Sequence, residues 1–369
     1  MEDILSREEK LVRAFRALCS RYGYRPYRMS KFEEYDLYAD NRGLLPPGGV
    51  ITFTDTNGRL MALKPDVTLS IAKNLTPPPG GSVRVYYDES VYRAPDRQLG
   101  FQEITQAGLE YLGEADAYAV GEAAAIARAA LDEIEPGGVL DITHMGYING
   151  LIDAVGAPAR AAAEIMRAVS QRNAHGVRAV CAAAGISGAP VERLCRAVGL
   201  YGPLRENLPA LAELSVNAAT ERAVGELTEL SGVLDAFGAL EGVNLDLAIA
   251  GDGDYYDGVA FKGYVPGVPS AVLSGGRYDK VLERLGKSGG AVGFALYLNL
   301  LERLYDADAA GYDADVLLIT GDAPPHIAAR AAREITAAGY SVRAERSGGR
   351  CRCRRRARID EAGEVEYLD

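Results

Sequence analysis

Hydrophobic residues near the start of the chain recur at the spacing of an amphipathic helix. They are Leu11, Phe15, Leu18 and Cys19. The next apolar runs are short, at 50–54 and 60–63, and they flank Asn57-Gly58, a dipeptide typical of tight hairpin turns. The pattern therefore predicts a helix over 5–23 and then a β-hairpin.

The middle of the chain changes texture twice. Residues 83–93 and 102–112 are rich in β-forming residues and are separated by a polar connection, which predicts two antiparallel strands. An alanine-rich helix over 114–135 and a short strand over 139–143 follow. From about 157 to 238, Ala, Leu, Glu and Arg dominate, which predicts an all-helical insertion.

Beyond the insertion the pattern predicts three strands and then two helices. The strands span 245–249, 258–264 and 271–273, and the helices span 278–285 and 292–305. A final unit, 313–369, has strand, helix and strand patterns in that order, which predicts a small parallel sheet. Its basic run, Arg350–Arg358, is interpreted as a solvated edge strand, with a phosphate or acidic partner as the alternative.

Composition limits the possible partners. The 369 residues carry a formal net charge of −11, which argues against a nucleic-acid surface, so tRNA is an unlikely partner. No apolar run is long enough to cross a membrane, and the charged start does not resemble a signal peptide, so we expect a cytoplasmic protein. Cys351 and Cys353 lack a second pair at zinc-ligand spacing, and we expect no metal.

One segment carries polar residues suited to binding an ammonium group, and a second carries polar residues at alternate positions. Asp66 and Thr68 can accept hydrogen bonds from a desolvated cation, although both also suit the start of a helix. Gln106 and Glu110 occupy alternate positions of a predicted strand, together with Gly108, so their side chains share one face of a sheet.

These segments occur in an order that resembles the histidyl-tRNA synthetases. Residues 63–69 are similar to an Arg-Pro-Glu-Gly-Thr element, 91–110 to motif 2 of class II synthetases, and 291–295 to the start of motif 3. Asp254-Tyr255-Tyr256 and Gly275-Gly276-Arg277-Tyr278-Asp279 match two further family elements. The resemblance implies an α+β fold, in which residues 1–310 form a class II synthetase-like antiparallel sheet flanked by helices, with the helical insertion at about 157–238. A small C-terminal α/β domain over 313–369 follows.

The resemblance also implies a histidine-binding pocket. Family residues at the positions of Asp66 and Thr68 contact the α-amino group, and those at Gln106 and Glu110 contact the amino group and the imidazole. The motif 2 arginine, here Arg93, clamps the carboxylate. Three tyrosines complete the set: Tyr255, Tyr256 and Tyr278. If Tyr255 and Tyr256 lie on a strand, they point to opposite faces and only one of them would reach the ligand.

Three positions depart from the synthetases. Gly251 stands where an arginine stabilises charge during adenylation, and losing such a cation typically costs about a hundredfold to a thousandfold in rate. Leu300 replaces the motif 3 arginine, while Arg303 comes three residues late, and Tyr297 replaces a glycine that gives the nucleotide room. We therefore expect no catalytic residues, no cofactor and no aminoacylation.

A preserved amino-acid pocket beside a damaged ATP site resembles the regulatory subunit of the short-form ATP phosphoribosyltransferase. That family implies a catalytic-subunit partner in a hetero-octamer, self-association as a dimer, and feedback inhibition by L-histidine at the first step of histidine biosynthesis. Two alternatives remain: a divergent histidyl-tRNA synthetase, and a synthetase-like protein of another pathway that is an altered enzyme or a scaffold.

Overall fold

The protein is described here from a computed structural model of the chain. The structure describes residues 6–41, 49–94, 100–252, 255–301, 304, 312–360 and 362–368. The chain divides into two compact units, residues 1–302 and 303–369, and each is described by itself. Within the described residues no helix combines the length and apolar character that crossing a bilayer requires.

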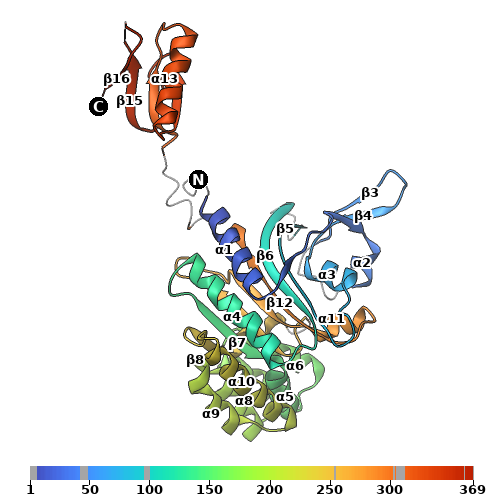
Figure 1. The fold of residues 1–369 in the computed structure, drawn as a ribbon. Helices are drawn as coiled ribbons and strands as arrows, with labels where there is room; N and C mark the ends of the chain where they lie inside the picture. Colours follow the sequence, from blue (N-terminus) through green and yellow to red (C-terminus); the bar gives the residue numbers. More distant parts are fainter. Residues whose placement is uncertain are drawn as a thin grey trace. The chain divides into compact units, whose positions relative to one another are not determined.

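A nine-stranded mixed sheet forms the centre of the first unit (Figure 1). Its strand order is β1-β5-β6-β12-β11-β10-β7-β9-β8. In that order the strands are β1 (Arg25–Pro26), β5 (Val83–Arg93), β6 (Gln102–Gly113), β12 (Gly290–Tyr297), β11 (Leu273–Arg277), β10 (Val259–Tyr264), β7 (Val139–His144), β9 (Val243–Asp246) and β8 (Tyr201–Pro203).

The central strand pairs are antiparallel, whereas β1 pairs with β5 and β7 with β9 in parallel. The predicted antiparallel sheet is thus a mixed sheet, antiparallel in its middle. The long β5–β6 pair places Gln106, Gly108 and Glu110 opposite Glu89, Tyr87 and Val85. Because facing residues of paired strands point the same way, these six positions lie on one face of the sheet.

Helices cover both faces of this sheet. On one face lie α1 (Arg7–Arg21) and α4 (Ala117–Ile134), whose buried side chains meet Phe261 and Phe294 of the strands. On the other lie α3 (Thr68–Asn74) and α11 (Asp279–Arg284), which share an apolar core with Tyr87, Val91 and Leu112. A small three-stranded sheet and α2 (Asp36–Asp40) adjoin that core. Its strand order is β2 (Phe32–Glu34), β4 (Leu60–Leu63) and β3 (Thr52–Thr54).

The hairpin predicted around Asn57-Gly58 is confirmed by the antiparallel pairing of β3 with β4. Its turn is longer than a two-residue loop, because the N–H of Asp55 bonds the carbonyl of Arg59 at 2.9 Å. The Asp55 carboxylate accepts the N–H groups of Asn57 and Arg59, and Gly58 adopts a φ of +80°. Glycine suits that left-handed conformation because it has no Cβ.

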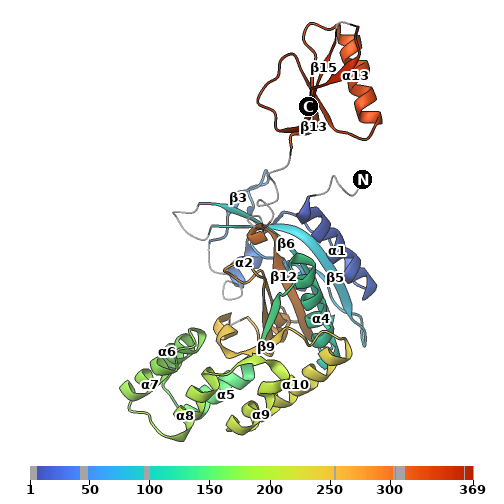
Figure 2. The same ribbon diagram turned by 90° about the vertical axis from the view of Figure 1, so that its left-hand side faces the viewer.

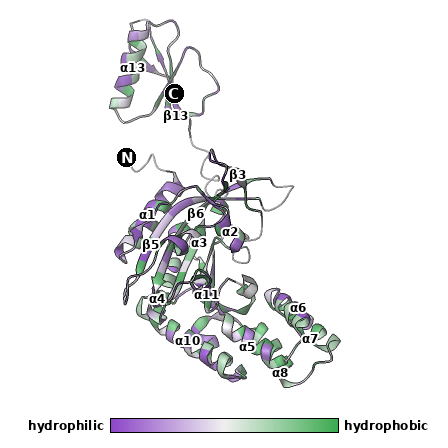
Figure 3. Cartoon of the chain, turned by 90° about the vertical axis from the view of Figure 1, so that its right-hand side faces the viewer, coloured by the Kyte–Doolittle hydropathy of each residue, from purple (hydrophilic) through white to green (hydrophobic). Residues whose placement is uncertain are grey.

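The insertion lies beyond the β7–β9–β8 end of the sheet (Figure 2). With the preceding α5 (Met145–Val155), its helices are α6 (Ala159–Ser170), α7 (Ala174–Ala183), α8 (Ala189–Val198), α9 (Leu204–Leu214) and α10 (Ala218–Ala236). Helices α6 and α8 are strongly amphipathic, and Figure 3 shows hydrophobic and hydrophilic stretches along both. The prediction that 157–238 is all helical is wrong at one point, because strand β8 leaves the helices and pairs with β9. Three residues are too few to show a strand period.

A second correction concerns 292–305, which the pattern predicts to be a helix. Residues 290–297 instead form β12, a central strand between β6 and β11, and η4 (Leu298–Leu301) is a 3₁₀ turn. Most of β12 is buried from both faces, so its sequence is almost continuously apolar and lacks the alternation that marks a half-exposed strand. Another 3₁₀ element, η3 (Leu247–Asp252), leads toward β10.

The small C-terminal unit has a four-stranded sheet in the order β14-β13-β15-β16. Its elements are β13 (Ala314–Ile319), α13 (Pro325–Ala337), β14 (Val342–Glu345), β15 (Cys353–Ile359) and β16 (Val365–Tyr367). The predicted β-α-β order and parallel pairing are confirmed. The arginine-rich segment was expected at an edge, but β15 pairs on both sides, and several of its arginines form surface ion pairs, such as Arg358 with Glu366.

Candidate functional site

Glu110 lies on strand β6, on the face of the main sheet that α3 and α11 cover. Its side chain is buried, with 1 % of the residue exposed. The Thr68 hydroxyl donates to Oε1 at 2.6 Å, and the Tyr278 hydroxyl donates to Oε2 at 2.5 Å. Three chain segments far apart in sequence therefore meet at one carboxylate.

Asp66 lies close enough to Glu110 for their charges to interact, and Arg93 contacts the residue before Asp66. Asp66 Oδ1 accepts the N–H of Leu69 at 2.8 Å, so Asp66 does bind the first turn of α3, as the helix-start alternative requires. Its carboxylate also interacts with the charge of Arg93, whose Nε donates to the Pro65 carbonyl at 3.0 Å. An acid and a guanidinium are therefore both held near the N-terminal end of α3.

The three tyrosines of the predicted pocket form one cluster of ring contacts. The rings of Tyr255 and Tyr256 meet edge to face with centroids 5.1 Å apart, and the Tyr255 and Tyr278 centroids are 5.7 Å apart. Tyr255 and Tyr256 precede β10 rather than lying in a strand, so the expectation that they point to opposite faces is wrong. Asp254 lies outside the described residues.

Gln106 is buried on the same face, two residues from Gly108 and four from Glu110. The structure thus gathers all eight predicted residues, Asp66, Thr68, Arg93, Gln106, Glu110, Tyr255, Tyr256 and Tyr278, on or beside one face of the sheet. Tyr297 pairs with Gln106 across β6 and β12, so it occupies this face as well. Leu300 lies in η4, Gly251 in η3, and Arg303 outside the described residues.

Sequence reasoning missed two features of this face. Tyr87 is buried, and its hydroxyl lies over Gly108, where a Cβ would overlap it. Lys64 is fully buried and its Nζ donates to Glu89 Oε2 at 2.9 Å. The period-two alternation of β5, which puts Tyr87 and Glu89 opposite Gly108 and Gln106, could have placed these two side chains on this face, but no local pattern identifies Lys64 as the partner of Glu89.

The site is electrostatically unusual because two carboxyl groups are close together. Burial raises the pKa of Glu110 to about 8, against the hydrogen bonds from Thr68 and Tyr278, and the neighbouring Asp66 adds to the increase. Burial also raises the pKa of Asp66, while the Leu69 N–H and the charge of Arg93 oppose it. A cation entering between these acids would favour their ionised forms.

Lys287 fixes the far end of the helix that carries Thr68. Its Nζ donates to the carbonyls of Ala72, Lys73 and Leu75 at 2.5, 2.6 and 2.8 Å. These are carbonyls at the C-terminal end of α3, where a cation is stabilising.

We expect Lys287→Met to lower the free energy of unfolding by about 1–2 kcal/mol, because it leaves several helix-end carbonyls without their charged donor. Urea denaturation measures the change. Lys10→Met, on the exposed side of α1, is the matched control and should change stability by less than about 0.5 kcal/mol. Equal stabilities of the two variants would contradict the role of Lys287 in stabilising the C-terminal end of α3.

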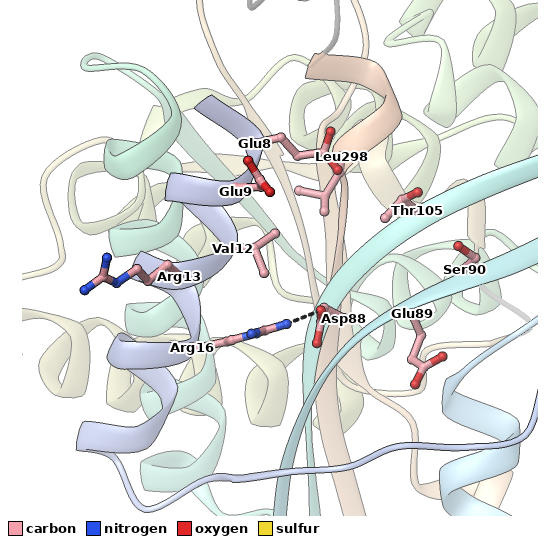
Figure 4. A pocket seen from close by; sticks show the side chains of 10 residues that line it. All are labelled: Glu8, Glu9, Val12, Arg13, Arg16, Asp88, Glu89, Ser90, Thr105 and Leu298. Atoms are coloured by element: carbon pink, nitrogen blue, oxygen red, sulfur yellow. Dashed lines mark hydrogen bonds and ion pairs between the residues drawn. The ribbon is translucent and has the colours of Figure 1, made fainter. Parts of the chain in front are cut away.

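A separate cavity of about 490 Å³ lies between α1 and strands β5 and β6 (Figure 4). Arg16 reaches across it to Asp88, while Glu9 is used in capping α1, and Glu89 pairs with Lys64. Three of its four acids, Glu9, Asp88 and Glu89, are therefore already paired within the protein. Within the described ranges no group of three or more His, Cys, Asp and Glu side chains is arranged to hold a metal ion.

The fold and site define a class II synthetase-like protein of the histidine type, and sequence comparison agrees. The sequence model described as histidyl-tRNA synthetase matches residues 2–301. A regulatory subunit of ATP phosphoribosyltransferase from Geobacter metallireducens is 30% identical over 349 residues, covering 91% of this chain and 78% of that protein. The chain belongs to the family of ATP phosphoribosyltransferase regulatory subunits, whose fold is that of the histidyl-tRNA synthetases.

Solved structures show the same fold. A chain described as an ATP phosphoribosyltransferase regulatory subunit/histidyl-tRNA synthetase, from Bacillus halodurans, superposes with a TM-score of 0.75 at 26% identity, covering 92% of this chain and 88% of that one. A chain of the ATP phosphoribosyl transferase (HisG:HisZ) complex from Thermotoga maritima gives 0.61 at 19% identity, covering 79% and 97%. The prediction of a regulatory subunit with a class II synthetase-like fold is confirmed.

Proposed function

We propose that this protein binds L-histidine at the Glu110 site and thereby transmits feedback inhibition to a short-form ATP phosphoribosyltransferase catalytic subunit, in the cytoplasm. The observation that carries the proposal is the pairing of opposite charges on one buried face. Asp66 and Glu110 suit an ammonium group, and Arg93 suits a carboxylate. The tyrosine rings, in edge-to-face and tilted contact, supply aromatic walls for an imidazole.

The partner and assembly rest on the family. A relative of the same fold forms part of a complex whose name includes both kinds of subunit. We propose that this chain likewise self-associates as a dimer and joins the catalytic subunit in a hetero-octamer, and that tRNA is not a ligand. Histidine would favour the less active arrangement of the assembly by its differential affinity, typically about 1–3 kcal/mol.

The test is a mixing assay with a purified short-form catalytic subunit. Activity should rise when this chain is added and fall on titration with histidine. Arg93→Met should require at least about tenfold more histidine for the same inhibition, because the carboxylate loses its charged partner. Arg178→Met, at an exposed ion pair on α7, is the matched control. Inhibition unchanged in Arg93→Met would contradict the assignment.

A divergent synthetase is the rival function. Gly251, Tyr297 and Leu300 oppose it, since two replace cations and the third puts a phenol where the family has a glycine. Histidine-dependent exchange of pyrophosphate into ATP by the purified chain would establish the rival and refute the proposal.

A further inference from the structure

Glu110 is held in a way that suits a carboxylic acid as well as a carboxylate. Both of its direct partners, Thr68 and Tyr278, are hydroxyl groups, which can accept a hydrogen bond as readily as donate one. An arginine or lysine in either place would fix the ionised form. Within the described residues Glu110 takes part in no ion pair.

The surroundings of Glu110 favour the acid form while the site is empty. The charged or titratable groups that face it come from the segments packed around β6. They are Asp66 before α3, Tyr87 on β5, Tyr255 before β10 and Tyr278 before α11. Gly293, its neighbour on β12, has no side chain, and a Cβ there would overlap Glu110 Oε2. Arg93 acts on Asp66 and donates to Pro65.

From this arrangement we propose that Glu110 is protonated in the empty site and releases its proton to solvent when an amino acid with a cationic ammonium group binds. The inference rests on the proposed function and deepens it. The chemistry is balanced: the O–H bond of the carboxylic acid breaks, the proton passes to water, and the carboxylate formed accepts an N–H of the ligand. The acid has one O–H, so only one of the two hydroxyls accepts from it; that hydroxyl then turns to donate, while the other donates throughout.

The sign of the pH dependence follows. The pKa of Glu110 is raised to about 8 in the empty site, and the bound cation favours the carboxylate. Affinity for histidine therefore increases with pH by up to about tenfold per unit below pH 8 and levels off above it. The subunit would respond to histidine more weakly as pH falls.

Titration calorimetry of the full-length chain with L-histidine, at pH 7 in buffers of different ionisation enthalpy, counts the protons. We expect about one released by the wild type at pH 7, and a smaller number above pH 8. Glu110→Gln keeps the shape of the side chain and its hydroxyl partners. On binding histidine, this variant should release only the protons that the ligand's own imidazole loses. Asp66→Asn removes the neighbouring negative charge, and its proton release should decline at lower pH than in the wild type.

The outcomes are separable. Histidine binding with the same proton count in wild type and Glu110→Gln would overturn the proton release and leave the proposed function standing. Absence of histidine binding by the wild type would overturn both. If Glu110→Gln does not fold or does not bind histidine, the test is the comparison of wild type with Asp66→Asn. Proton release on binding should decline at a lower pH in Asp66→Asn, and identical pH profiles of proton release would contradict the proposal.

Discussion

Gly293→Ala should abolish histidine binding and destabilise the protein strongly. The added Cβ would overlap Glu110 Oε2 and come within 2.5 Å of the Leu109 carbonyl oxygen. Both obstacles are on a neighbouring strand in the middle of the sheet, so neither can move away cheaply. We expect unfolding to become easier by about 3 kcal/mol and binding to weaken by at least about a hundredfold, because overpacking displaces the carboxylate.

Urea denaturation and calorimetry measure the two effects of Gly293→Ala. Gly225 on α10 is the matched control, since a Cβ there meets nothing within 4 Å. Gly225→Ala should stabilise the protein by up to about 1 kcal/mol, as alanine does in an exposed helix. Binding by Gly293→Ala at wild-type affinity would show that Glu110 is not part of the ligand site.

Removing Glu122 should have the next largest effect. Its carboxylate is almost fully buried on α4 and accepts from Arg84 Nη1 at 2.5 Å. Arg84 is itself held between the rings of Tyr24 and Tyr111. Glu122→Ala would leave a guanidinium partly buried among aromatic rings without its counter-ion. We expect the free energy of unfolding to fall by about 3 kcal/mol.

The comparison is with Glu192, which accepts two hydrogen bonds from Arg178 at the surface. Both side chains of that pair are about half exposed, at 49% and 59%. Glu192→Ala should cost less than about 1 kcal/mol, because water screens the pair and replaces its hydrogen bonds. Thermal or urea denaturation distinguishes the two, and similar losses would mean that burial of Glu122 does not matter.

Much of the first unit follows from local patterns. The β5–β6 pair and the hairpin around Gly58 show in the sequence because their residues alternate or turn in ways that few other structures allow. The alternation of Gln106 and Glu110 also predicted the face they share. The eight candidate site residues came from family motifs, and the structure gathers them on or beside one face.

The failures have a common physical cause. Strand β12 is mostly buried on both faces, so burial removed the alternation that would distinguish it from a helix. Lys64, which follows β4 of the small sheet, and Glu89, on β5 of the main sheet, are 25 residues apart in sequence and meet only in the folded chain. Tyr255 and Tyr256 precede β10, so their side chains do not follow the alternation of a strand. Contacts between segments distant in sequence are therefore what single-sequence patterns miss.

Strand β8 ties the insertion to the sheet. Through Tyr201, Gly202 and Pro203 it pairs with β9, the last strand of the core on that side. Removing 157–238 would expose the unpaired N–H and C=O groups of β9. The β9 side of the sheet would then be an open edge that could pair with a strand of another molecule. The insertion therefore protects this edge from pairing with another molecule. A chain without it would need another protection of β9, such as a proline or a charged side chain on that strand.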